Sequence, residues 1–156
     1  MNLPFPIRQE CPPGACVCGR EQLLADPGSD IRVLRLTREE EKKLIARLDS
    51  VATLAELEHM QQRMMALLGI SVSIRPSIHG VRTVRGFNID IAQQPGLCRK
   101  TRQAIPAAIR RCLDRHPEIA YAILDAQGLL GMEMDLDLDL HEAPAGPGDD
   151  APSPPA

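Results

Sequence analysis

The sequence predicts an α+β fold, in which a small antiparallel or mixed sheet of about five strands has helices packed on one face. Three observations lead to this prediction. Short segments in which apolar and polar residues alternate are typical of half-buried strands. Longer segments with apolar residues three or four positions apart, two of them opened by a Thr-x-x-Glu capping box, are typical of helices. The 156 residues, of which 44% are apolar, are enough for one hydrophobic core.

The first 30 residues predict an irregular arm that is rich in cysteine, proline and glycine. Five prolines and three glycines interrupt any regular pattern in this segment. A short helical turn can form over residues 20–25, because Leu23 and Leu24 would pack against the rest of the protein. A single α+β domain is expected to follow over residues 31–140.

One strand and two helices are predicted next. Alternation over residues 31–36 indicates the strand. Thr37 and Thr53 are each followed by glutamate three positions later, which predicts the starts of two helices, and Gly69 ends the second. The apolar residues predicted to line the buried sides of these helices are Leu44, Ile45 and Leu48 in the first and Leu57, Met60, Met64, Leu67 and Leu68 in the second.

The middle of the chain predicts two strands and a long helix. Apolar residues alternate over residues 70–74 and again over residues 87–91, as in half-buried strands. A helix is predicted over residues 97–115, where Pro106 should either bend it or open a new helix. Cys112 falls on the apolar face of this helix and is predicted to lie in the core.

The C-terminal part predicts a β-hairpin and an acidic tail. A strand over residues 119–124, a turn at residues 125–128 and a partner strand over residues 129–140 would form the hairpin. Residues 141–156 are rich in Pro, Gly and Asp and are expected to be disordered. The net charge of −3 is unevenly distributed, because residues 132–156 contain seven acidic and no basic side chains.

Three cysteines near the N-terminus are the clearest indication of chemistry. They occur in the segment Cys11-Pro-Pro-Gly-Ala-Cys16-Val-Cys18. In an extended segment Cys16 and Cys18 would project to the same side, and the Pro-Pro-Gly turn would allow Cys11 to fold back towards them. Thiolates gathered in this way bind zinc or an iron–sulfur cluster. The spacing matches neither the plant-type ferredoxin pattern nor the paired Cys-x2-Cys of zinc ribbons.

A metal site of this kind requires a fourth ligand. Cys98 is the best candidate, because it follows a Pro-Gly break at the expected start of a helix, where a thiolate is favoured. His79 is a weaker candidate. The sequence therefore predicts a small accessory or regulatory protein with zinc or an iron–sulfur cluster held by Cys11, Cys16, Cys18 and Cys98. The alternatives are an arm without a ligand, a redox-active thiol pair, or cysteines packed as small apolar residues.

Two other functions are open, and both involve macromolecular partners. A nucleic-acid-binding regulator would use the basic segment of residues 75–115 to contact phosphates; the side chains concerned are Arg82, Arg85, Arg99, Lys100 and Arg102. A protein-interaction module or a homodimer would use the methionine-rich helix over residues 54–68, because methionine adapts to varied surfaces. No complete catalytic motif occurs in the sequence, so an enzyme is the less favoured class.

The sequence also predicts where the protein resides. No apolar segment reaches the length of about 20 residues that crosses a bilayer, and the N-terminus lacks the apolar stretch of a secretory signal. A cytoplasmic location is therefore expected, in which the five cysteines stay reduced and are available to a metal.

Overall fold

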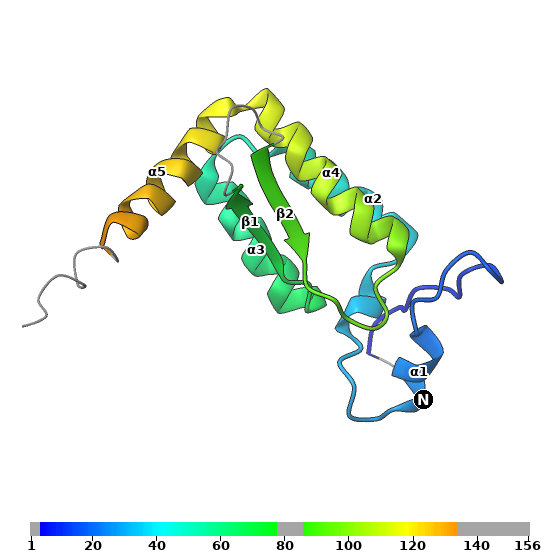
Figure 1. Ribbon diagram of the computed structural model, residues 1–156. Helices are drawn as coiled ribbons and strands as arrows, with labels where there is room; N and C mark the ends of the chain where they lie inside the picture. The colour runs from blue at the N-terminus through cyan, green and yellow to red at the C-terminus, as the bar shows by residue number, and fades with distance from the viewer. Residues whose placement is uncertain (1–3, 78–85, 134–156) are drawn as a thin grey trace, which may run out of the picture. The chain divides into compact units, whose positions relative to one another are not determined.

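A computed structural model describes residues 4–77 and 86–133 of the chain and confirms the α+β class (Figure 1). Within these residues the protein has five α-helices, one 3-10 helix and one two-stranded antiparallel sheet. The elements are α1 (Arg20–Ala25), η1 (Arg32–Arg35), α2 (Arg38–Ser50), α3 (Leu54–Leu68), β1 (Val72–Pro76), β2 (Phe87–Ile91), α4 (Arg99–Arg115) and α5 (Pro117–Glu133).

The chain divides into a unit of residues 1–124 and a unit of residues 125–156. All the buried core residues described and all five cysteines belong to the first unit. The tail predicted to be disordered, residues 141–156, lies outside the described residues. Among the described residues, no helix combines the length and the hydropathy that a membrane span requires.

The two predicted capping boxes form as expected. The Thr37 hydroxyl accepts the N–H of Glu40 at 3.3 Å, and the Thr53 hydroxyl accepts the N–H of Glu56 at 3.2 Å. Both contacts satisfy backbone donors that have no partner within the helix. At the other end of α3, Gly69 has a φ of 68°, the left-handed conformation that ends a helix at low cost in glycine.

The buried sides of α2 and α3 agree with the predicted pattern except at one position. Leu48, Leu57 and Met64 are fully buried. Leu67, which was predicted to face inwards, is 44% exposed. Its side chain lines a surface groove together with Met60 and Arg63 instead of lying in the core.

The strand predicted over residues 31–36 is wrong, because this segment forms η1. The carboxylate of Asp30 accepts the backbone N–H of Arg32 at 3.1 Å, and the N–H of Leu34 bonds to the carbonyl of Ile31 at 3.0 Å. These local bonds compete with strand pairing. The tight turn also buries the adjacent side chains Val33 and Leu34 together, which a strand would place on opposite faces.

The two strands predicted in the middle of the chain pair with each other. β1 and β2 are antiparallel, with Ile74 opposite Ile89 and Pro76 opposite Phe87. Phe87 and Ile89 are buried and the intervening Asn88 is exposed, which is the alternation of a half-buried strand. The expectation of about five strands is wrong for the described residues, in which these are the only two strands.

The predicted hairpin beginning at residue 119 is also wrong where the structure describes it. Residues 117–133 form α5, so the expected turn at residues 125–128 lies inside a helix. Pro117 occupies the first helical position, where its missing N–H costs nothing. Ile119, Ala120 and Ile123 are buried, and their spacing fits one side of a helix. Residues 134–140 of the predicted partner strand lie outside the described residues.

Helix α4 packs beside α2 and begins next to the N-terminal arm (Figure 1). Its predicted apolar face is confirmed, with Ile105, Ala108, Ile109, Cys112 and Leu113 fully buried. The guanidinium of Arg111 donates to the Asp49 carboxylate at 2.9 Å and joins α4 to the end of α2. The helix runs without interruption past Pro106. These contacts hold α4 against the rest of the unit.

Candidate metal centre

A tight turn separates the first two cysteines of the arm. The N–H of Ala15 bonds to the carbonyl of Pro12 at 3.0 Å, which closes a four-residue turn. Proline as its second residue and Gly14, with a φ of 78°, as its third are the combination that a type II turn favours. The turn reverses the chain between Cys11 and Cys16, as the sequence predicts.

Over the next three residues, exposed and half-buried side chains alternate. Val17 is fully exposed, whereas Cys16 and Cys18 on either side of it are half-buried. The carbonyl of Cys18 accepts the N–H of Gly96, which joins the arm to the loop before α4. The two cysteines therefore face the body of the protein, and the apolar side chain between them points into solvent.

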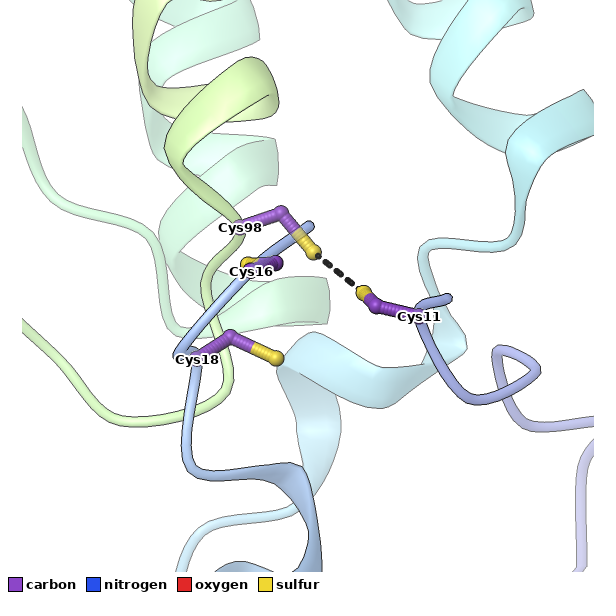
Figure 2. Close-up of side chains that lie close together, drawn as sticks. All are labelled: Cys11, Cys16, Cys18 and Cys98. Carbon is purple, nitrogen blue, oxygen red and sulfur yellow. Dashed lines mark hydrogen bonds between the residues drawn. The ribbon is translucent and has the colours of Figure 1, made fainter. Parts of the chain in front are cut away.

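The fourth cysteine stands at the beginning of α4. Cys98 is the N-cap residue of this helix, but its side chain makes no capping hydrogen bond. Instead, its sulfur lies 3.5 Å from the sulfur of Cys11, across a separation of 87 residues. The thiol is thus directed towards the arm rather than towards its own helix (Figure 2).

The four cysteines form one compact cluster (Figure 2). The sulfur atoms of Cys11, Cys16, Cys18 and Cys98 all lie within 4.8 Å of one another, and each side chain is half-buried. Cys112 is fully buried in the core, where its thiol donates to the Val51 carbonyl at 3.3 Å. Four of the five cysteines are therefore placed where they could bind a metal ion.

The surroundings of the cluster change the acidity of its thiols in both directions. Burial raises the pKa of Cys98 far above its ordinary value, and the hydrogen bond with Cys11 raises it further. Burial also raises the pKa of Cys11. The backbone N–H of Arg99, at the start of α4, hydrogen bonds to the sulfur of Cys16 and lowers its pKa. The surroundings therefore favour the protonated thiol at Cys11 and Cys98 and the thiolate at Cys16, in the direction of their pKa shifts.

Arg8 is a neighbour of the cluster that the sequence analysis did not identify. Its Nη2 donates to the sulfur of Cys18 at 3.3 Å, and its charge opposes the rise in the pKa of Cys98. The backbone of Arg8 is fixed at both ends, because its N–H donates to Leu34 and its carbonyl accepts from Arg20. Nothing in the sequence around Arg8 indicates this position, which depends on how the arm folds against η1.

The guanidinium of Arg8 has no carboxylate partner among the described residues. Its Nε and Nη1 are buried, and neither makes a hydrogen bond in the part of the chain that the structure describes. A buried cation is stable only when negative charge lies near it. The sulfur of Cys18, 3.3 Å from Nη2, can supply such charge in its thiolate form.

The residues predicted for nucleic-acid binding are only partly visible. Arg99 and Lys100 are exposed on the first turn of α4, and Arg102 is half-buried. Arg82 and Arg85, together with the alternative ligand His79, fall outside the described residues. A basic surface that includes all five side chains therefore stays a prediction.

Comparisons with models of protein families, with characterised proteins and with solved structures find no match for this chain. The functional argument consequently depends on the geometry and the chemistry of the cysteine cluster itself.

Proposed function

We propose that Cys11, Cys16, Cys18 and Cys98 bind one metal ion, with zinc as the first candidate, and that this ion holds the N-terminal arm to the start of α4. The single observation that carries the proposal is the approach of four sulfur atoms to within 4.8 Å of one another. The three arm residues and Cys98 come from segments far apart in the sequence, so their meeting is a property of the fold.

The spacing of the sulfur atoms favours a single ion over an iron–sulfur cluster. Tetrahedral zinc with Zn–S bonds of about 2.3 Å separates its sulfur ligands by about 3.8 Å. Sulfurs that already lie within 4.8 Å of one another need only small shifts to reach this arrangement. In a cluster of several irons, different cysteines bind different irons. The sulfur atoms would then have to move apart, and the half-buried arm would have to open.

The electrostatic surroundings also suit a tetrathiolate ion. Four thiolates around a divalent cation carry a net charge of about −2, which must be offset by nearby donors. Arg8 supplies a positive charge beside Cys18, and the Arg99 N–H at the start of α4 supplies a donor to Cys16. Hydrogen bonds of this kind orient metal ligands and raise the affinity for the ion.

The role we infer for the ion is structural. Four protein ligands complete the tetrahedral coordination of zinc and leave no position open for water or substrate. The proposal accordingly describes a small accessory protein whose arm is fixed by a metal rather than by extensive packing. In the cytoplasmic location expected from the sequence, reduced thiols would be available to bind it.

Metal analysis of the purified protein tests this function. The full chain is purified anaerobically, and its zinc and iron contents are measured together with its visible absorption spectrum. The proposal predicts one zinc ion per chain and no visible colour. The Cys98→Ser variant should lose the ion, whereas Cys112→Ser, which changes a cysteine outside the cluster, should retain it. Wild-type protein without a stoichiometric metal, even after incubation with zinc, would overturn the proposal.

A further inference from the structure

A groove on the side of the molecule formed by α2 and α3 is a second candidate ligand-binding site. It has a volume of about 270 Å³ and lies between these helices, η1 and residues 5–6 of the arm. The cysteines do not line it, so it is separate from the metal centre. Cavities of this size hold a few side chains of a partner rather than a whole domain.

The floor of the groove is apolar and built largely from leucine and methionine. Leu36 and Met64 are buried beneath it, and Met60 is half-buried. At its edge Leu67 is 44% exposed. Large apolar side chains left accessible next to a groove commonly mark a binding surface, and methionine adapts well to its partner.

The rim of the groove is positively charged. Four basic side chains line it, namely Arg35, Lys43, Arg47 and Arg63, against the single acid Glu40. Glu40 is already paired with Lys43 at 2.8 Å, and Arg35 lies over the Phe5 ring at 4.8 Å. Within the described residues the guanidinium groups of Arg47 and Arg63 make no hydrogen bond or ion pair, so both can meet an incoming ligand.

We propose that this groove binds an acidic amphipathic helix of a partner protein. The apolar face of such a helix would lie on the leucine and methionine floor, and its carboxylates would meet the cations on the rim. A fatty acid would match the apolar floor, but its single carboxylate would leave most of the rim without a partner. Several basic side chains distributed around the groove therefore favour a ligand with several acidic groups.

Selection from a peptide library tests the proposal without assuming a partner sequence. A phage library of 16-residue helical peptides with randomised surface positions is selected against the purified full chain. We expect the bound peptides to carry leucine or methionine at i, i+3, i+4 and i+7, flanked by Asp or Glu, and to weaken as salt is added. Enrichment of neutral or basic peptides, or failure to enrich any peptide, would overturn the proposal.

Matched variants localise the binding. The double variant Arg47→Glu/Arg63→Glu should weaken the best selected peptide by at least tenfold, and Leu67→Asp should have a similar effect. Arg38→Glu, which changes an exposed arginine on α2 that does not line the groove, should leave the affinity within about twofold. Equal affinity for all four proteins would place the peptide elsewhere and contradict the proposal.

Two competing occupants are distinguished in the same set of measurements. Dodecanoic acid that binds at the groove while the acidic peptides do not would assign the site to a fatty acid and overturn the proposal. A wild-type dimer in sedimentation that becomes monomeric in the Arg47→Glu/Arg63→Glu variant would assign it to a second copy of this chain. A monomeric protein that binds the acidic peptides supports an acidic amphipathic helix as the occupant of the groove.

Discussion

At the scale of single residues, Arg8 makes the most informative contact outside the four cysteines. Because its guanidinium donates to Cys18 and has two further buried nitrogens without a partner in the described residues, it should stabilise the negative charge of the loaded site. Arg8→Gln is expected to weaken zinc binding by about 10–100-fold, the usual effect of removing a residue that supports metal ligands. Competition with a zinc chelator measures this affinity.

The control for Arg8 is an arginine remote from the cluster. Arg110→Gln removes the same charge from an exposed position on α4 and should leave the zinc affinity unchanged. If both variants bind zinc as tightly as the wild type, Arg8 has no part in the site, although the metal centre itself would stand.

Gly96 should be sensitive to the smallest substitution. Its φ is +85°, and a Cβ atom would come within 2.8 Å of Val33 Cγ1 and would also collide with Leu23. Gly96→Ala is therefore expected to destabilise the protein by about 2–4 kcal/mol in urea denaturation. Zinc affinity should also fall, because the Gly96 N–H positions the Cys18 carbonyl.

Gly28→Ala is the matched control, since a Cβ there meets only Asp26 Oδ1 at an ordinary distance of 3.6 Å. Its denaturation midpoint should stay close to that of the wild type. A Gly96→Ala protein as stable as Gly28→Ala would show that the loop before α4 can relax, which contradicts the close packing of Gly96 against Val33 and Leu23.

The four cysteine ligands of the candidate site could be predicted from the sequence, but the contacts around them could not. Cys98 could be named from the sequence because a Pro-Gly break indicated the start of a helix, and helix starts favour thiolates. The approach of Arg8 and the hydrogen bond from the Arg99 backbone depend on the path of the arm against η1 and α4, which leaves no local pattern.

At the scale of the elements, the N-cap of α3 offers a direct test of local stabilisation. Removing the hydroxyl that accepts the Glu56 N–H, by Thr53→Ala, should cost about 1 kcal/mol in chemical denaturation. Thr53→Ser keeps an accepting oxygen and should lose much less. If the two substitutions destabilise the protein equally, the hydroxyl contact does not contribute.

Replacing Pro106 inside α4, in contrast, is expected to stabilise the protein. Proline in a helix interior removes one hydrogen bond and costs about 3 kcal/mol, partly offset by the rigidity it gives the unfolded chain. Pro106→Ala should therefore raise the stability by about 1–2 kcal/mol. Pro117→Ala, at the favourable first position of α5, should not raise the stability of the protein. If Pro106→Ala lowers the stability, proline at this position is not the cost to α4 that we expect.

The elements that sequence patterns located correctly are those with local boundary signals. Capping boxes marked the starts of α2 and α3, and glycine marked the end of α3. Three predicted strands are wrong within the described residues. Over residues 31–36 the hydrogen bond of the Arg32 N–H to the Asp30 carboxylate favours η1. Pro117 begins α5, which occupies the described part of the predicted hairpin. Alternation over six residues does not separate a strand from a short buried helical segment.

At the scale of the whole molecule, the proposed ion is the link between the irregular arm and α4. The three arm cysteines reach Cys98 across a sequence separation of as much as 87 residues. Removing the ion should therefore release the arm, while α4 stays packed through its buried face. Limited trypsin digestion should cleave after Arg8 and Arg20 faster, on the order of tenfold, once a chelator is added.

Cleavage within α4, at Arg110 and Arg115, serves as the internal control and should change much less. An arm that resists trypsin equally with and without the chelator would mean that packing alone holds it. The ion would then have no structural role, even if it binds.

X-ray absorption at the zinc edge of the purified full-length protein tests the central claim most directly. A single ion held by Cys11, Cys16, Cys18 and Cys98 requires four sulfur neighbours at about 2.3 Å. A first shell that contains nitrogen or oxygen would contradict the tetrathiolate site, and an iron–iron distance in the corresponding iron-edge spectrum would contradict a single ion.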